Sequence, residues 1–211
     1  MKNMRKLILH MITSLDGFIT DRHGSGPGPG GQYDEEVQQF YLDLFTSAGA
    51  VIYGRGIYNQ YVGYWRHVAS GDQPPANDIE LRWTQRLMEM PKYVISRTQT
   101  DVYRNTTILR DTDTIPQLKQ DAGGDILLIC GPALCADLLS KQMIDEFMLY
   151  VCPAVFGKGT SLFQEIPDNL LLSFEKIIPF KAGMNLHYYT PNYNGSPSPS
   201  SIRRAERLSK V

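Results

Sequence analysis

The segment formed by residues 125–139, DILLICGPALCADLL, places the tightest constraint on the fold. Its apolar run, residues 126–129, is too short for a helix and is typical of a buried strand. Gly131 and Pro132 interrupt the run, and proline suits the first turn of a helix, where its missing N–H leaves no bond unmade. Apolar residues then recur at helical spacing, at Leu134, Leu138 and Leu139. The segment therefore predicts a strand, a tight glycine turn and the start of a helix.

Two interpretations of this turn stay open. A helix N-terminus carries free backbone N–H groups and the positive end of the helix dipole, so it can bind a phosphate group. An ordinary connection between a strand and a helix has the same sequence pattern. The rest of the chain has to discriminate between them.

Composition excludes several classes of protein. With 211 residues, 42% of them hydrophobic and 20% charged, the chain is typical of a soluble globular protein. The formal net charge of −1 favours neither nucleic acid nor an anionic membrane as a partner. We find no apolar run of membrane-spanning length and no convincing signal peptide. The partners expected are small molecules.

The cysteines indicate the compartment. Cys130, Cys135 and Cys152 are odd in number and form no C-x-x-C motif, which favours reduced thiols and a cytoplasmic protein. No histidine lies near Cys130 and Cys135 in the sequence, so we expect no metal site.

Strand and helix patterns alternate through the first two thirds of the chain, which predicts an α/β fold. The predicted strands are residues 7–12, 50–53, 92–95, 106–109 and 126–129, and the predicted helices begin at Asp34, Ile57, Asn77, Asp111 or Thr112, and Pro132. The last third contains strand patterns only, at residues 145–151, 170–178 and 184–189, which predicts an antiparallel end. We expect a single domain over residues 1–191 and a disordered Pro/Ser-rich and basic tail over residues 192–211.

Two further segments each allow two interpretations. Residues 21–31, DRHGSGPGPGG, cannot pack a core and are either a plain surface loop or a mobile lid over a site. Residues 58–65 are rich in aromatic side chains, which either pack the core or form the wall of a pocket for a flat ligand.

Short motifs follow the predicted strands in a characteristic order. They are Ser14-Leu15-Asp16-Gly17, Gly54-Arg55, Ser96-Arg97-Thr98, Gly131, and Phe156-Gly157-Lys158-Gly159 with Leu162-Phe163. Over about residues 4–191 the chain thereby resembles the dihydrofolate reductase-like superfamily. It most closely resembles the reductase domain of the bifunctional riboflavin-pathway deaminase-reductase, and the stand-alone bacterial relatives of that domain.

The resemblance implies a three-layer αβα fold, with a mixed, mostly parallel sheet and an antiparallel C-terminal hairpin, and a bound NADPH. The cofactor-binding residues that it implies are Gly54 and Arg55 at the pyrophosphate, Ser96, Arg97 and Thr98 at the adenosine 2′-phosphate, and Gly131, Pro132, Ala133 and Leu134 beneath the pyrophosphate and nicotinamide. A guanidinium group and hydroxyls suit a doubly charged phosphate. A solvated surface charge is the alternative interpretation of Arg97.

The chain departs from its relatives at two positions. Ile57 stands where they usually carry a threonine, and Pro132 replaces the second glycine of the turn, so one hydroxyl and one N–H are missing. The sequence contains no H-x-E followed by C-x-x-C, the deaminase signature. We therefore expect a stand-alone reductase.

The activity implied is NADPH-dependent hydride transfer to a small pyrimidine- or pterin-like heterocycle, similar to that of 5-amino-6-(5-phosphoribosylamino)uracil reductase of riboflavin biosynthesis. Asp16 is the candidate catalytic residue, as a polar contact to substrate, although a turn-forming aspartate before Gly17 explains it equally well. The candidate substrate contacts are Tyr33, Tyr61, Trp65 and Phe156. The alternatives are a non-catalytic NADPH-binding protein and a dihydrofolate reductase, for which Glu35, Glu36 and Asp43 offer no clear match to the pterin-binding acid.

Relatives of this domain usually pair, so we expect a homodimer. Apolar residues of the C-terminal strands, Phe147, Leu149, Leu171 and Phe174, would offer the paired edge.

Overall fold

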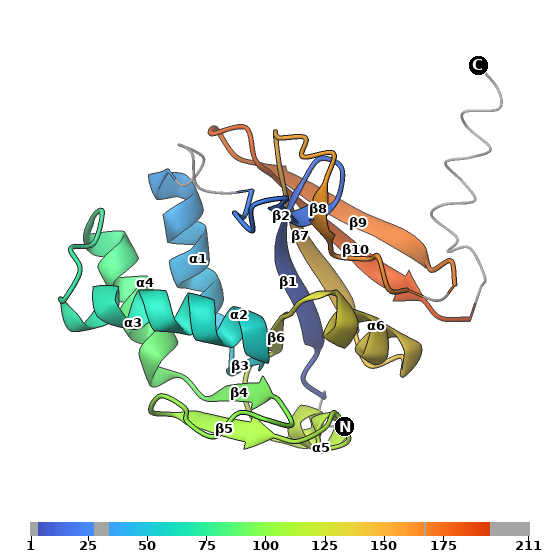
Figure 1. The fold of residues 1–211 in the computed structure, drawn as a ribbon, viewed down its shortest axis with the longest axis horizontal. Coiled ribbons are helices and arrows are strands. Elements are labelled where there is room, and N and C mark those ends of the chain that lie inside the picture. Colours follow the sequence, from blue (N-terminus) through green and yellow to red (C-terminus); the bar gives the residue numbers. More distant parts are fainter. Residues whose placement is uncertain (1–3, 28–33, 167, 195–211) are drawn as a thin grey trace.

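An eight-stranded sheet forms the centre of the molecule (Figure 1). The structure is a computed structural model, and it describes residues 4–27, 34–166 and 168–194. In spatial order the strands are β5 (Thr106–Leu109), β4 (Lys92–Ile95), β3 (Ala50–Gly54), β6 (Ile126–Ile129), β1 (Leu7–Ser14), β7 (Glu146–Cys152), β10 (Asn185–Asn192) and β9 (Leu171–Pro179). Neighbours from β5 to β7 are parallel, whereas β10 is antiparallel to both β7 and β9. The predicted mixed, mostly parallel sheet with an antiparallel C-terminal hairpin is confirmed.

Helices cover the sheet on both sides, which is why the central strands are continuous apolar runs. The helices are α1 (Glu35–Ser47), α2 (Arg55–Ile57), α3 (Gly63–Ser70), α4 (Asp78–Glu89), α5 (Ile115–Gln120) and α6 (Pro132–Ser140), with a π-helical turn η1 (Tyr58–Val62) between α2 and α3. Figure 1 shows α1, α3 and α4 on one side of the sheet and α6 on the other. Every residue of β6 is buried between these layers.

Side-chain caps fix the starts of two helices where the sequence predicts them. Asp34 Oδ1 accepts a hydrogen bond of 3.0 Å from the N–H of Val37, and Asn77 Oδ1 accepts one of 3.0 Å from the N–H of Glu80. The predicted start of the helix near residue 112 is wrong. Thr112 is buried and its hydroxyl donates to Asp137 at 3.0 Å, so α5 begins only at residue 115.

Two strands were not predicted. β2 (Phe18–Asp21) and β8 (Gly159–Ser161) form a separate antiparallel pair, in which the register shifts between residues 18 and 20. All four residues of β2 are half-buried, so their sequence shows no alternation of inward and outward side chains. This pair lies beyond the carboxyl end of β1 (Figure 1).

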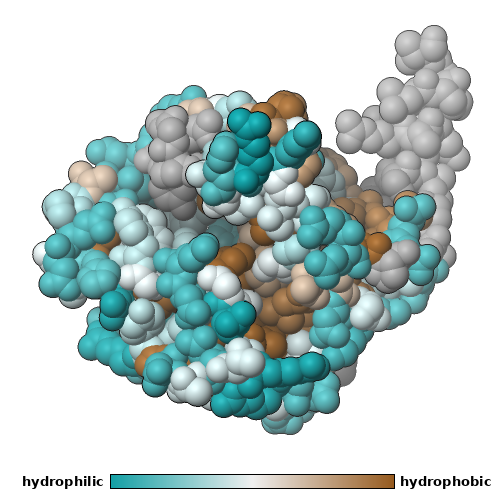
Figure 2. Space-filling model, viewed as in Figure 1, coloured by the Kyte–Doolittle hydropathy of each residue, from teal (hydrophilic) through white to brown (hydrophobic). Residues whose placement is uncertain are grey.

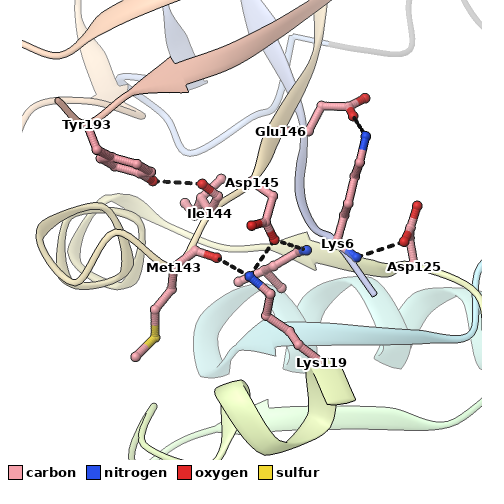
Figure 3. A network of polar contacts seen from close by, with 9 residues as sticks. Lys6, Lys119, Asp125, Met143, Ile144, Asp145, Glu146 and Tyr193 are labelled. Atoms are coloured by element: carbon pink, nitrogen blue, oxygen red, sulfur yellow. Dashed lines mark hydrogen bonds and ion pairs between the residues drawn. The ribbon is translucent and has the colours of Figure 1, made fainter. Parts of the chain in front are cut away.

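Polar contacts tie together the opposite, amino ends of the central strands (Figure 3). The Asp145 carboxylate accepts a hydrogen bond of 2.7 Å from the N–H of Leu7 and forms an ion pair of 2.6 Å with Lys119. The Asp125 carboxylate accepts a hydrogen bond of 2.8 Å from the N–H of Lys6. Carboxylates therefore satisfy backbone donors where β1 starts, and the register of β1 against its neighbours is fixed at this end.

The expected pairing face is corrected in part. Phe147 and Leu149 are 1% and 8% exposed, because β7 lies inside the sheet between β1 and β10, so they offer no surface. Leu171 and Phe174, on the edge strand β9, are 53% and 42% exposed. An apolar surface on an edge strand therefore exists, but it belongs to β9 alone.

The folded part continues past residue 191. Asn192 pairs with Leu171 in the sheet, and the Tyr193 hydroxyl donates to the carbonyl of Ile144 at 2.8 Å. Residues 195–211 of the predicted tail lie outside the described residues. Within the described part, none of the helices combines the length and apolar character that crossing a membrane requires. All three cysteines are buried free thiols.

Candidate functional site

The central strand β1 has unequal partners on its two sides. Its pairing with β7 continues to the end of the strand, at Ser14 and Cys152, whereas its pairing with β6 stops at Leu9 and Leu128. The carboxyl-terminal part of β1 therefore presents a backbone edge on the β6 side that no described strand covers. Open α/β sheets bind ligands in such crevices beyond the carboxyl ends of parallel strands.

A cavity of about 430 Å³ lies along this edge. Its walls are mainly apolar and aromatic and come from β1, β2, α1, the α2–α3 segment, α4 and β6. The residues that line it are His10, Met11, Ile12, Ile19, Thr20, Gly24, Gly26, Pro27, Tyr41, Ile57, Gln60, Tyr61, Tyr64, Trp65, Glu80 and Ile129. Figure 2 shows hydrophobic side chains gathered in a hollow on this face of the molecule. The size and walls suit a flat ring system of small-molecule size.

Two glycine turns meet beside the cavity. A Cβ atom built on Gly54, at the end of β3, would lie 3.6 Å from Leu134 Cδ2 and 3.7 Å from Cys130 Cα. The start of α2 is therefore packed against the turn that leads from β6 into α6. No side chain of the described residues caps the N-terminus of α2 or α6, whereas α1 and α4 are capped. The N-termini of α3 and α5 also lack a side-chain cap, so the missing cap does not by itself distinguish a phosphate site from an ordinary connection. The N–H groups in the first turns of α2 and α6 can bind an anion.

The turn after β4 is held by its own contacts. Ser96 is buried, and its hydroxyl oxygen accepts hydrogen bonds from the N–H groups of Thr98 and Gln99 at 3.2 and 2.9 Å. Arg110, which sequence reasoning missed, donates through Nη1 to the carbonyls of Ser96, Arg97 and Gln99 at 3.0–3.2 Å. The Arg97 and Thr98 side chains are exposed at the end of β4. Ser96 thus shapes the turn, and Arg97 remains the cation predicted to meet a phosphate.

The backbone conformation of Gly131 does not explain the glycine. Its φ of −81° and ψ of 177° are accessible to any residue, so glycine is not required there for its backbone angles. A Cβ atom on Gly131 would meet no protein atom within 4 Å. The absence of a side chain therefore keeps open space in front of α6. Pro132 occupies the first turn of α6, with Ala133 exposed and Leu134 half-buried behind it.

The Asp16 carboxylate is engaged by the protein itself. It accepts hydrogen bonds from the Ser14 hydroxyl at 2.6 Å, the Phe156 N–H at 3.1 Å and the Gly157 N–H at 2.8 Å. These bonds, the one from Ser14 first, lower the pKa of Asp16 to about 2. The contacts favour the turn-forming interpretation, because Asp16 joins the end of β1 to the 156–157 turn. A carboxyl group with this pKa is ionised at neutral pH, which excludes it as the proton donor there.

The structure places the four candidate substrate-contact residues differently. Tyr61 and Trp65 line the cavity, in agreement with the flat-ligand interpretation of the aromatic segment, whereas Tyr58 is buried in the core. Phe156 does not line this cavity, because the turn that carries it is bound by Asp16 and lines a separate recess beside β2. Tyr33 lies outside the described residues.

The predicted lid is described only in part. Gly24, Gly26 and Pro27 line the cavity, which places the first half of the segment at the site. Residues 28–31 lie outside the described residues. Closure over a ligand stays a prediction.

Sequence reasoning missed several polar residues of the cavity wall, among them His10 and Glu80. His10 stands within an apolar strand and was treated there as part of the buried run. Glu80 lies three residues after the helix cap Asn77, a spacing typical of a capping box. The acidic candidates on the first helix, Glu35, Glu36 and Asp43, do not line the cavity, and Glu80 on α4 does.

Aromatic rings enclose His10. Its ring centroid lies 5.3, 6.0 and 5.1 Å from those of Tyr41, Phe45 and Tyr150, in edge-on arrangements. The side chain is 3% exposed, and its Nδ1 has no hydrogen-bond partner among the described residues. Desolvation by this burial lowers the pKa of His10 to about 3, so the imidazole is neutral at physiological pH.

Comparison with known proteins identifies the family. A sequence profile of the RibD C-terminal domain matches residues 5–186. The chain belongs to this family. It is 26% identical over 185 residues to the uncharacterized protein YyaP of Bacillus subtilis (strain 168), which covers 85% of this chain and 92% of YyaP.

Two solved structures support the fold. The diaminohydroxyphosphoribosylaminopyrimidine deaminase/5-amino-6-(5-phosphoribosylamino)uracil reductase of Thermotoga maritima matches 90% of this chain and 58% of its own, with a TM-score of 0.60 and 12% identity. A dihydrofolate reductase of Enterococcus faecalis, complexed with NADP(H), matches 89% of this chain and 96% of its own, with a TM-score of 0.56 and 12% identity. At such identities the likeness concerns the fold, which is the dihydrofolate reductase-like fold expected from the sequence.

The burial of His10 predicts a pH dependence of stability. The unfolded chain binds a proton at this imidazole below about pH 6.5, whereas the folded protein does not until about pH 3, so the free energy of unfolding falls as the pH falls through this window. Between pH 7 and pH 5 the loss due to His10 is about 2 kcal/mol. We expect His10→Phe to remove this loss, as measured by urea unfolding at both pH values.

His23→Gln, on the exposed segment after β2, is the matched control and should keep the pH dependence of the parent protein. A His10→Phe variant whose unfolding free energy still falls by the parent's amount would show that His10 titrates normally in the fold.

Proposed function

We propose that the protein is an NADPH-dependent reductase of a small pyrimidine- or pterin-like heterocycle. The observation that carries the proposal is the juxtaposition of two uncapped helix N-termini with the uncovered edge of β1, beside a cavity with apolar and aromatic walls. Helix ends that can bind an anion and a pocket with aromatic walls in one crevice suit a dinucleotide with an aromatic head group. Membership of the RibD C-terminal domain family supports a reductase.

The residues present fit this cofactor. The free N–H groups at the starts of α2 and α6, together with Arg55, would hold the pyrophosphate, and the open space at Gly131 lets it approach the backbone. Arg97 and Thr98 would meet the 2′-phosphate. The uncovered peptide groups of β1 near Ile12 offer hydrogen bonds to a planar carboxamide.

When bound, NADPH supplies the hydride, and the protein supplies orientation and shielding from water. Tyr61 and Trp65 form an aromatic wall that would keep the acceptor ring flat in the cavity. The buried His10 side chain and the apolar side chains of the wall, such as Ile19 and Ile129, would limit the access of water to the same space. Asp16 would act by holding the 156–157 turn in place, and a contact from Asp16 to substrate stays a prediction.

Two alternative functions differ from the proposed one, the first in the hydride acceptor and the second in the absence of turnover. A dihydrofolate reductase would oxidise NADPH in the presence of dihydrofolate, and a non-catalytic NADPH-binding protein would bind the cofactor without oxidising it. NADPH oxidation followed at 340 nm with pyrimidine and with pterin acceptors separates all three. Cofactor binding without oxidation by any acceptor would leave only the binding protein.

Arg97→Ala should abolish the preference for NADPH over NADH. One charge-assisted contact to the 2′-phosphate contributes about 1.5–3 kcal/mol, so the parent should bind NADPH at least about tenfold more tightly than NADH. Calorimetry with both cofactors gives the ratio. Arg82→Ala, an exposed arginine on α4, is the control. A variant at Arg97 that discriminates as well as the parent would place the 2′-phosphate site elsewhere.

Gly131→Val should remove NADPH binding without destabilising the fold. The backbone angles accept valine and its Cβ atom would meet no protein atom within 4 Å, so we expect a change in unfolding free energy within about 0.5 kcal/mol. A ligand that binds the folded state raises the melting temperature, so the NADPH-induced rise should vanish in this variant. Ser140→Val, at the exposed far end of α6, should keep it. A normal rise in Gly131→Val would mean that no ligand approaches this turn.

We also propose a homodimer, in a cytoplasmic protein. Its support is the apolar surface of the edge strand β9, where Leu171, Phe174 and Ile177 are 53%, 42% and 45% exposed. Phe174→Glu should shift the species seen by sedimentation at micromolar concentration from about 48 kDa, twice the 23.9 kDa chain, to the monomer. A parent protein that sediments as a monomer would contradict the proposal.

A further inference from the structure

A second recess lies beside β2, outside the cavity. Its volume is about 530 Å³, and the residues that line it are Asp21, Arg22, His23, Val155, Phe156, Gly157 and Lys158. They come from the turn that follows β2 and the turn that precedes β8, two strands that lie side by side (Figure 1). The proposed reductase function assigns no role to this recess.

Two cations face each other at the end of this strand pair. The last residues that pair in β2 and β8 are Asp21 and Gly159. One residue further out, Arg22 comes opposite Lys158, and both exposed side chains line the recess. Like charges at directly opposite positions of an antiparallel pair destabilise it.

The backbone prevents the cations from moving apart by a change of register. Gly159 has a φ of 149°, and a Cβ atom there would overlap the carbonyl oxygen of Thr20. Only glycine permits this close approach, which fixes β8 against β2. The turn before β8 is held as well, because the N–H groups of Phe156 and Gly157 donate to the Asp16 carboxylate at 3.1 and 2.8 Å.

The carboxylate of the recess does not pair with these cations. Asp21 Oδ1 accepts hydrogen bonds from the N–H groups of His23 and Ser25 at 2.8 and 2.9 Å, which closes the turn after β2. Neither Arg22 nor Lys158 forms an ion pair with any carboxylate of the described residues. The repulsion between the two cations therefore stays uncompensated by the described part of the chain.

His23 adds a third donor. Its Nε2 accepts a hydrogen bond of 2.9 Å from Arg22 Nε, so the proton of the neutral ring lies on Nδ1. No described residue accepts a hydrogen bond from Nδ1. A guanidinium group, an ammonium group and an imidazole N–H thus border one recess with hydrogen-bond donors that the described chain does not use.

From this arrangement we propose that the recess binds a phosphate group between Arg22, His23 and Lys158, at a site separate from the cofactor and the cavity. A phosphate carries close to two negative charges near neutral pH and accepts hydrogen bonds from several directions, so it can neutralise both cations at once. A carboxylate carries one charge and accepts in one plane. The phosphate is either inorganic or the ester group of a small metabolite.

Calorimetric titration of inorganic phosphate into the full-length protein, at constant ionic strength and without NADPH, tests the site. We expect binding to weaken at least about tenfold in Lys158→Gln and in Arg22→Gln, because each change removes a charge-assisted contact. Lys158→Arg keeps the charge and should bind phosphate like the parent. Lys181→Gln, at an exposed lysine between β9 and β10, is the matched control and should also bind like the parent.

Thermal melts separate a binding role from a structural one. Without phosphate, Lys158→Gln should melt no lower than the parent, because the change removes the repulsion from Arg22. Phosphate should raise the melting temperature of the parent and not that of the variant.

Ribose 5-phosphate distinguishes the two sources of the phosphate. A rise with this compound and with inorganic phosphate supports a site for phosphate esters, and a rise with inorganic phosphate alone supports a site for the free anion.

Three outcomes would decide against the inference or against the proposed function. If Lys158→Gln binds phosphate like the parent, or if acetate at the same ionic strength raises the melting temperature as much, the phosphate site is overturned. If Lys158→Gln weakens NADPH binding as strongly as phosphate binding, the recess belongs to the cofactor site and the separate site is overturned. If NADPH does not bind the parent while the phosphate results hold, the reductase is overturned and the phosphate site stands.

Discussion

The unequal pairing of β1 is the constraint on which the site depends. A strand in a parallel sheet needs hydrogen-bonded neighbours on both sides, and β1 loses one of them beyond Leu9 while the other continues to Ser14. The polar contacts at the amino end, through Asp145 and Asp125, prevent β1 from sliding to cover the gap. The backbone edge left open is therefore a fixed feature of the sheet, and the cavity lies against it.

Local chemistry made much of the fold predictable from the sequence. The buried strands are uninterrupted apolar runs, such as residues 126–129. Asp34 and Asn77 are typical N-cap residues, and they mark the starts of α1 and α4. β2 and β8 escaped prediction because they are short, half-buried and irregular in register. The start of α5 escaped it because Thr112 forms a distant hydrogen bond to Asp137 in place of capping the helix. In both cases tertiary contacts decide the local structure.

The same division applies to the candidate site. The turns at Gly54 and Gly131 were predictable, because a strand, a glycine and a helix start are adjacent in the sequence. His10 and Glu80 were not, because each has an ordinary local explanation, as a strand residue and as part of a helix cap. Only the fold brings β1 and α4 to one cavity. Asp16 is the opposite case. Its sequence motif suggested a contact to substrate, whereas its hydrogen bonds in the structure join the end of β1 to the 156–157 turn.

Unsatisfied polar atoms concentrate around this cavity. Buried atoms without a hydrogen-bond partner in the described structure include His10 Nδ1, Tyr150 Oη and Trp83 Nε1, and their rings belong to one aromatic cluster with the cavity residue Tyr41. Each such atom costs about 1–3 kcal/mol relative to a satisfied one. Apolar side chains of similar shape would avoid the cost, as the pH dependence attributed to His10 also implies. The cost falls directly behind the cavity wall, because Trp83 and Tyr150 contact the lining residue Tyr41 without lining the cavity themselves. A local sacrifice of stability beside a crevice is typical of functional sites.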